Sequence, residues 1–452
     1  MTRRGAAWFF ALGAALLSAP AAGAGQAPVA PEAAIAAARA AMADTARGAS
    51  LRVVLLTVGQ GEFVWERFGH NLLWIRDERT GESVTWNWGL FRFDEPGFYR
   101  RFLFGNTRYW MAGEDPVSTF AVYQRLGREV VAQELALSPG QRAALDALVR
   151  VTALEEYKFY RYDYFIDNCS TRLRDALDIV LGGALRAALD VPLRDTITYR
   201  SESLRLVQHS TWLVLGMDLA LGAPADMPLT AWQAGFIPMR LRDAVRSVTV
   251  PGPDGSPVPL VAREYVALQS PREADRAALA VAPHAKPVVI TLLVLVTLLV
   301  TLSALARRGL SSARTALVAT GMIIHLTFGF LSSALVFMAL FTRHQFWDWN
   351  PHLLLFTPVS LAVAALLPRA ARGARSAWVG YYHVVMTGVA LAVAVGLLVQ
   401  YRAGLTPGAG LLMVWAHVSW VLHLALLATL AGRPAPDGDG PPPEAAAMRM
   451  VA

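Results

Sequence analysis

Five long apolar runs dominate the C-terminal half of the chain. They cover residues 288–306, 315–341, 353–367, 377–400 and 411–431. As helices, runs of this length cross the roughly 30 Å of hydrocarbon in a bilayer, although the third run is short. The pattern therefore predicts an all-α membrane domain over 288–431 with about five transmembrane helices.

The connections between these runs differ in positive charge. If the first run travels inward from an exported domain, successive connections alternate between the two sides of the membrane. The inner connections carry six arginines and the outer ones two: Arg307, Arg308, Arg314, Arg369, Arg372 and Arg375 against Arg343 and Arg402. This asymmetry predicts that the tail, 432–452, is cytoplasmic, and its content of Pro, Gly and Ala predicts disorder.

The N-terminal segment has the features of an export signal. Arg3 and Arg4 precede a short apolar stretch, and small residues at 22–24 suit cleavage, so residues 1–24 are predicted to be a signal peptide, of the Sec type rather than the twin-Arg type. Residues 25–48 are Ala-rich and predict a mobile leader. Residues 49–248 have a globular composition, and 249–287 hold seven prolines, which predicts a linker or an edge segment.

Composition limits the classes of protein and site. The chain has 452 residues, 55% of them hydrophobic and 17% charged, which excludes a disordered protein and argues against a wholly soluble one. A single cysteine excludes an intramolecular disulfide and a cysteine-ligated zinc or iron–sulfur site. The net charge of +7 is mostly scattered arginine, without the basic stripe of a nucleic-acid-binding protein. No metal site or cofactor is expected.

The one cysteine, Cys169, lies at a predicted helix start. It stands within Asp167-Asn168-Cys169-Ser170-Thr171, a cluster of residues that favour N-cap positions, and apolar residues at steps of three and four follow. The helix dipole and the free N–H groups there favour a thiolate, and Arg172 adds a positive charge. The alternative is a buried, inert cysteine.

His70 stands where a loop enters a predicted strand. An alternating segment, 83–89, follows a turn at 77–82, which predicts a hairpin in which residues i and 159−i face each other. His70 then lies near Gly89, and Asn87 lies diagonally across on the same face, where its amide could orient the imidazole. A register slip of one residue would remove Asn87 from this face, and a structural histidine is the alternative.

Four segments of the exported region together resemble the Lnb N-terminal periplasmic domain, a family of bacterial lipoprotein N-acyltransferases. They are residues 67–73, 86–91, 102–105 and 162–175, and the resemblance extends over about 50–245. It implies an α+β papain-like fold of the permuted NlpC type, the branch that includes lecithin retinol acyltransferase. It also implies that His70 and Cys169 are the catalytic pair, at the periplasmic face of a multi-pass inner-membrane protein.

The resemblance implies a transfer reaction between two lipids. Cys169 would take an acyl chain from a membrane phospholipid as a thioester, and the N-terminal amine of an S-diacylglyceryl-cysteine lipoprotein would accept it, with His70 handling protons. Two other interpretations stay open: a membrane-tethered thiol hydrolase that cuts cell-wall peptides or lipids, and a non-enzymatic membrane assembly or binding protein.

The connection 342–350 combines charge with aromatic side chains. Arg343, His344 and Trp347 are candidate contacts for a lipid headgroup, together with Arg172 of the exported domain. The alternative is an ordinary aromatic belt at a membrane surface.

Overall fold

A computed structural model describes residues 30–252, 256–270, 285–354 and 357–371, and most of 381–391 together with 395. The chain divides into two compact units. The first contains residues 1–282 together with 338–349, and the second contains 283–337 and 350–452. The predicted signal peptide, the fifth apolar run and the tail lie outside the described residues.

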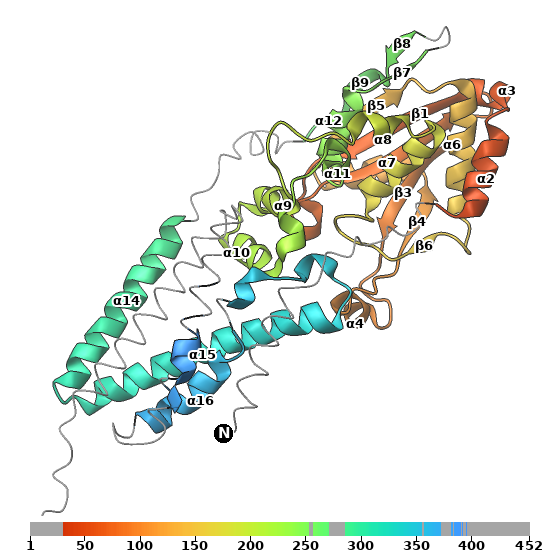
Figure 1. The fold of residues 1–452 in the computed structure, drawn as a ribbon. Helices are drawn as coiled ribbons and strands as arrows, with labels where there is room; N and C mark the ends of the chain where they lie inside the picture. The colour runs from red at the N-terminus through yellow and green to blue at the C-terminus, as the bar shows by residue number, and fades with distance from the viewer. Residues whose placement is uncertain are drawn as a thin grey trace, which may run out of the picture. The chain divides into compact units, whose positions relative to one another are not determined.

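A seven-stranded antiparallel sheet organises the first unit (Figure 1). Its order is β6-β4-β3-β2-β1-β5-β9. The strands are β1 (Leu51–Val58), β2 (His70–Asp77), β3 (Ser83–Leu90), β4 (Tyr109–Glu114), β5 (Val130–Leu135), β6 (Phe159–Tyr160) and β9 (Val261–Leu268). The predicted α+β character of this region is confirmed.

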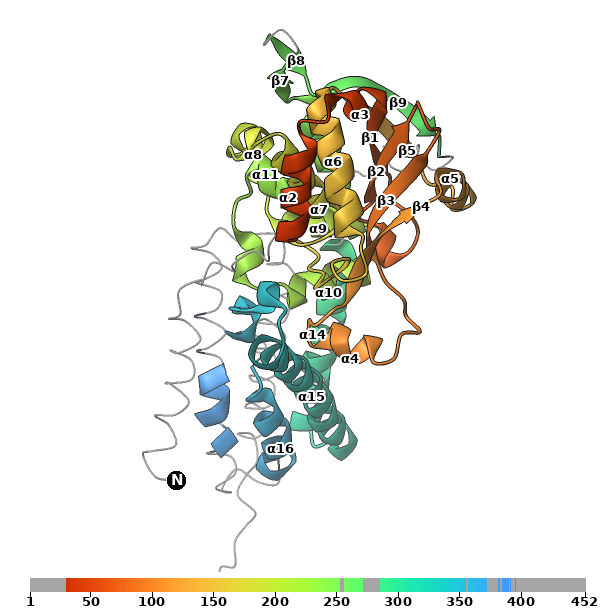
Figure 2. The ribbon, with the colours of Figure 1, turned by 90° about the vertical axis from the view of Figure 1, so that its right-hand side faces the viewer.

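The two faces of the sheet have different covers. Alternate side chains of β1 point to opposite faces of the sheet. Leu51, Val53 and Leu55 enter the main core, whereas Val54, Leu56 and Val58 face a smaller cluster. The main core packs under α6 (Pro139–Thr152) and α7 (Cys169–Val180), and α5 (Pro116–Arg125) covers the other face (Figure 2). Alternate side chains of the strand therefore pack against the apolar sides of the helices in one core.

The described part of the Ala-rich leader, residues 30–48, is packed, which corrects the prediction of a mobile segment there. Two helices, α2 (Glu32–Ala41) and α3 (Thr45–Ser50), lie against α6, and Ala34 and Ala38 are buried in the main core. A Cβ built on Gly140 of α6 would lie 2.3 Å from the carbonyl oxygen of Met42. Small side chains on both elements therefore allow the close approach, and composition alone does not distinguish such a helix from a loose leader.

The predicted linker, 249–287, contributes structure at its start. A short hairpin forms from β7 (Thr249–Pro251) and β8 (Pro257–Pro259), and β9 then pairs with β5 at the edge of the sheet. Pro251, Pro257 and Pro259 stand in the hairpin, where a missing N–H is tolerated, and Pro287 lies within α14. The sheet therefore extends to residue 268 of the predicted linker. Residues 271–284 lie outside the described residues.

Several short helices follow α7 in the first unit, and some of them contribute to a second, aromatic core. They are α8 (Ala184–Leu189), α9 (Tyr199–Val207), α10 (Thr211–Ala220), α11 (Ala231–Ala234) and α12 (Pro238–Arg246), with η2 (Ala223–Asp226). Phe165, Tyr199 and Phe236 pack there around Phe346, which η3 (Gln345–Trp347) supplies. A connection predicted for the membrane half thus completes the core of the first unit.

The second unit is helical where it is described. Helix α14 (Ala285–Arg307) covers the first apolar run and α15 (Ser311–Phe341) the second. Among the described residues, α15 alone has both the length and the hydropathy of a membrane span, and its 31 residues extend about 46 Å. Within the described residues the third run forms η4 (Pro351–Leu354) and α16 (Ser360–Ala370), which is 11 residues long.

Candidate active site

Cys169 is the first residue of α7, as the capping pattern predicts. The side chain of Asn168 accepts hydrogen bonds from the backbone amides of Ser170 (2.8 Å) and Thr171 (2.9 Å). The amide group of the same side chain donates to the carbonyls of Tyr164 and Phe236, both at 3.0 Å. The start of the helix is therefore fixed from both sides, and the sulfur is fixed with it.

His70 begins β2, in the predicted hairpin register. Leu72 pairs with Asn87 and Leu73 with Trp86, so paired numbers sum to 159 as expected. The imidazole Nε2 lies 2.7 Å from the side-chain oxygen of Asn87, and the Asn87 amide nitrogen donates to Glu114 at 3.1 Å. Since the carboxylate only accepts, the amide is oriented with its oxygen toward the ring, and Nε2 carries a proton. Nδ1 is then the basic nitrogen.

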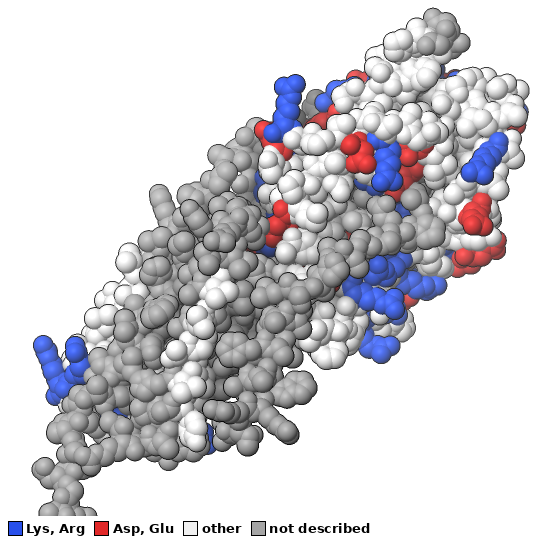
Figure 3. Space-filling view, viewed as in Figure 1, with Lys and Arg blue, Asp and Glu red and all other residues white. Residues whose placement is uncertain are grey.

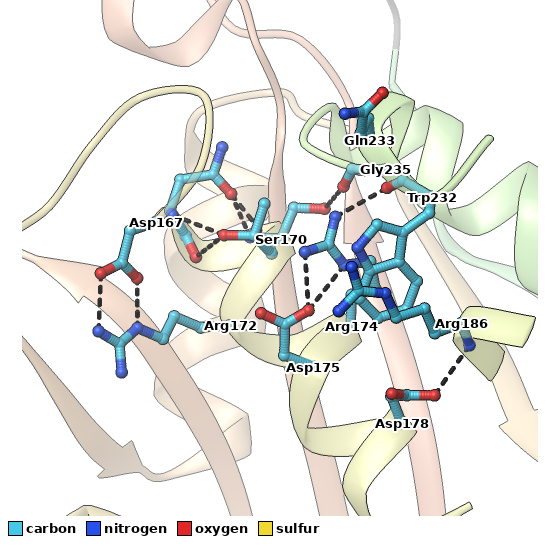
Figure 4. Close-up of polar contacts among 12 residues, drawn as sticks. Asp167, Ser170, Arg172, Arg174, Asp175, Asp178, Arg186, Trp232, Gln233 and Gly235 are labelled. Atoms are coloured by element: carbon cyan, nitrogen blue, oxygen red, sulfur yellow. Dashed lines mark hydrogen bonds and ion pairs between the residues drawn. The ribbon is translucent and has the colours of Figure 1, made fainter. Parts of the chain in front are cut away.

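The residues that follow the candidate pair hold β2 and α7 together. Asn71 donates from its amide to the hydroxyl of Ser170 at 3.0 Å. Ser170 in turn donates to the carbonyl of Gly235 at 2.6 Å (Figure 4). Thr57 of β1 donates to the Asn71 oxygen at 2.9 Å. These groups are buried, so each lost bond would leave an unsatisfied polar atom. The bracing fixes His70 and Cys169 relative to each other.

The thiol and the imidazole perturb each other's pKa. Burial raises the pKa of Cys169, but the charge of His70 and a hydrogen bond with it outweigh burial, and the pKa is lowered overall. Burial lowers the pKa of His70, but the charge and the hydrogen bond of Cys169 outweigh it, and the pKa is raised. Both shifts favour a thiolate beside an imidazolium, which is the reactive form of a cysteine nucleophile.

Alkylation of Cys169 should therefore depend on His70. The thiolate persists above the lowered pKa and is lost as the pH falls through it, so the alkylation rate should rise at a lower pH than for an ordinary thiol. In His70→Ala the sulfur stays buried without its partner, so the pKa should rise and the rate at neutral pH should fall. Iodoacetamide labelling across a pH series, read by intact mass, measures both midpoints.

No other thiol contributes to the labelling signal, because the chain contains no other cysteine. Equal midpoints in the wild type and His70→Ala would contradict the coupling of the two groups.

Gly89 leaves space beside the sulfur. It lies at an irregularity in the β3–β4 pairing with a φ of +89°, a conformation that other residues rarely adopt. A Cβ at this position would lie 3.6 Å from the Cβ of Cys169, 3.5 Å from the ring of Tyr162 and 3.8 Å from the hydroxyl of Tyr160. Cys169 is 7% exposed, so access to it is narrow and any side chain at 89 would reduce it further.

The four predicted substrate contacts occupy different surroundings. The guanidinium of Arg172 forms an ion pair with Asp167 and lies over the ring of Tyr160, 4.4 Å from its centroid. His344 Nε2 lies 2.9 Å from the carbonyl of Phe102, and Trp347 donates to the Tyr164 hydroxyl at 2.9 Å. The side chain of Arg343 is exposed. Three of the four therefore have polar atoms engaged within the first unit.

Other residues of the site escaped sequence reasoning. The candidate pair is positioned or bordered by four further residues: Asn71, Ser170, Glu114 and Gly89. In the sequence, only the adjacency of Asn71 to His70 and of Ser170 to Cys169 indicated a role, and nothing indicated Glu114 or Gly89. Within the part of the chain that the structure describes, no group of three or more His, Cys, Asp or Glu side chains is arranged to hold a metal ion.

Two family models match the chain. The Lnb N-terminal periplasmic domain matches residues 38–202, and the Lnb transmembrane domain matches residues 281–426, so together they cover well over half of the sequence. Comparison with curated proteins and with solved structures gave no match.

Proposed function

Because the chain belongs to the Lnb family of lipoprotein N-acyltransferases, as an inner-membrane protein with a periplasmic N-terminal domain, we propose that Cys169 and His70 are its catalytic pair. The transfer runs from a membrane phospholipid to the N-terminal amine of an S-diacylglyceryl-cysteine lipoprotein. The observation that carries the proposal is the placement of His70, oriented by Asn87, beside Cys169 at the capped start of α7, with the neighbouring residues Asn71 and Ser170 hydrogen-bonded to each other.

In the first half-reaction the Cys169 thiolate attacks an ester carbonyl of the phospholipid. The carbonyl oxygen gains negative charge in the tetrahedral intermediate. Asn168 caps the amides of Ser170 and Thr171, which leaves the Cys169 amide at the helix start as a donor to that oxygen. The His70 imidazolium gives its Nδ1 proton to the leaving alcohol, and a thioester and a lysophospholipid form.

In the second half-reaction the lipoprotein amine attacks the thioester. Neutral His70 accepts a proton from the amine through Nδ1, the C–S bond breaks, and the product is an amide. The thiolate and the imidazolium are restored together. No external energy source is needed, since an amide is more stable than a thioester.

Asn87 is the orienting residue in this proposal. Its oxygen accepts from Nε2 of His70 and its amide is fixed by Glu114, so the ring is held in the tautomer with a basic Nδ1. This role parallels the asparagine of Cys-His-Asn sites.

The proposal extends to the fold and the membrane topology. A histidine on a strand, preceding a cysteine at the start of a helix, suits the permuted NlpC-type papain-like arrangement. We propose about five transmembrane helices over 288–431, with the C-terminus in the cytoplasm, on the strength of the apolar runs and the arginine asymmetry.

A mass measurement on the Cys169 peptide tests the reaction. Purified full chain in detergent is mixed with a phospholipid of defined acyl chain and then digested. We expect an acyl group on the peptide that contains Cys169. When a diacylated lipopeptide is added, this acyl group should be lost from the peptide and an N-acylated lipopeptide should form. Clearance by water without the lipopeptide would indicate a hydrolase. Absence of any adduct, with acyl transfer retained in Cys169→Ala, would exclude the mechanism.

A further inference from the structure

The first unit exposes a chain of aromatic side chains outside the site. We call it the aromatic face: Phe63, Trp65, Phe93, Tyr99 and Phe102. Trp65 stacks on Phe63 at 5.0 Å and contacts Phe93 at 5.4 Å, so the side chains are contiguous. Single exposed apolar residues are ordinary on a protein surface, whereas a contiguous set marks an interaction surface.

The aromatic face is built around the short helix α4 (Phe98–Leu103). Only Phe98 of this helix is buried, and it holds the others in place through contacts with Phe93 (5.2 Å) and Phe102 (6.0 Å). Tyr99 is 71% exposed. The helix thus turns its large rings outward, which is the reverse of the usual arrangement for a helix on a soluble domain.

Arginines border the aromatic face, and Figure 3 shows basic side chains gathered around α4. Arg92 pairs with Asp94, and Arg101 and Arg108 share Glu95. Arg100 is exposed on the helix itself. Four arginines against two carboxylates leave an excess of positive charge beside exposed rings. Aromatic rings with a cationic border match the headgroup region of a phospholipid leaflet.

The chain connects this face directly to a membrane helix. The amide of Arg343, two residues after α15 ends, donates to the carbonyl of Phe104 at 3.0 Å. The ring of His344 lies 6.3 Å from the ring of Phe102. A Cβ on Gly105 would lie 3.0 Å from the backbone of Arg343. The C-terminal end of α4 is therefore held to the chain within two residues of the end of α15.

From these observations we propose that the aromatic face lies in the periplasmic leaflet of the inner membrane, with its rings among the acyl chains and its arginines on lipid phosphates. The occupant is a phospholipid surface. Buried apolar area and headgroup attraction both stabilise such a position.

The aromatic face is also linked to Cys169 by stacked rings. Phe91 stacks on Phe98 (5.8 Å) and Tyr109 (4.9 Å), and Tyr109 stacks on Tyr162 (4.4 Å), which borders Gly89 beside the sulfur. We infer that the aromatic face and this row together guide the donor acyl chain from the leaflet to the thiol. This second part rests on the proposed acyl transfer.

Depth measurement in a membrane tests the first part. In a Cys169→Ser background a spin label is attached at Tyr99→Cys or, as the matched control, at Val117→Cys on α5, which is 77% exposed. The full chain is reconstituted in vesicles of phosphatidylethanolamine and phosphatidylglycerol. The label at 99 should be relaxed by oxygen and shielded from a water-soluble nickel chelate, and the label at 117 should show the opposite. Equal nickel access at both positions would overturn the proposal. This is also the result expected if the aromatic face binds a protein partner and not the membrane.

Acylation kinetics test the second part. Tyr99→Asp with Phe102→Asp should slow acylation of Cys169 by vesicle phospholipid about tenfold, equivalent to roughly 1.4 kcal/mol, and leave acylation by a water-soluble short-chain thioester unchanged. Val117→Asp should affect neither. Equal loss with both donors would contradict the guiding role. A wild type that no donor acylates would refute the proposed function, while the depth measurement would still decide the position of the face.

Discussion

Replacement of Cys169 by alanine is expected to lower the rate of lipopeptide N-acylation by about 10³-fold or more, because no other thiol can form the acyl-enzyme. Alanine suits the first turn of α7, and Asn168 still caps the amides of Ser170 and Thr171, so the domain should fold. The rate is measured with full chain, phospholipid vesicles and a diacylated lipopeptide, with the N-acylated product quantified by mass.

The double variant separates a catalytic pair from two independent contributions. His70→Ala alone should lose activity by a similar factor, and Cys169→Ala with His70→Ala should lose little more than either single change, because the two groups act as a unit. An unchanged melting temperature in all three variants provides the control for folding. A Cys169→Ala protein that keeps its activity within tenfold of the wild type would refute the nucleophile assignment.

Replacement of Arg174 by methionine is expected to destabilise the periplasmic domain by about 3–5 kcal/mol. The side chain is 2% exposed and lies 3.8 Å over the ring of Trp232. It donates to Asp175 at 2.8 Å and to the Trp232 carbonyl at 2.7 Å (Figure 4). The variant leaves a buried carboxylate without its cation. Thermal unfolding of the full chain, followed by tryptophan fluorescence, measures the loss.

Arg186 provides the matched control for this prediction. It is also an arginine near Trp232, but its side chain is 55% exposed and its guanidinium pairs with Asp190 at 3.7 Å. Arg186→Met should cost less than about 1 kcal/mol. Combining Arg174→Met with Asp175→Leu should recover part of the stability, because it removes the unpaired charge. Similar melting temperatures for Arg174→Met and Arg186→Met would show that the buried pair is not important for stability.

Local signals account for what the sequence predicted well. The Asn168 cap fixes the start of α7 through contacts within three residues, and the turn at 77–82 fixes the register that brings Asn87 to His70. Both depend on short-range chemistry that the residues themselves display. The contact of β2 with α7 depends on long-range packing, and the resemblance, not the spacing, suggested it.

Long-range packing also explains the two differences in the fold. An alanine-rich segment has the same composition whether it is mobile or packed, and α2 is ordered because α6 presents Gly140 to it. The connection after α15 has the composition of an aromatic belt, yet Phe346 enters the core of the first unit. In both cases the partner is distant in the chain, so no local period could reveal it.

The insertion of Phe346 has a consequence for biogenesis. Its ring lies 4.6 Å from Phe165 and 5.0 Å from Tyr199, and its carbonyl accepts from the Gly222 amide at 2.7 Å. The polypeptide preceding residue 338 therefore lacks the side chain that fills this cluster. In the order of synthesis, the aromatic core of the first unit is therefore completed only after the whole of α15 has been made.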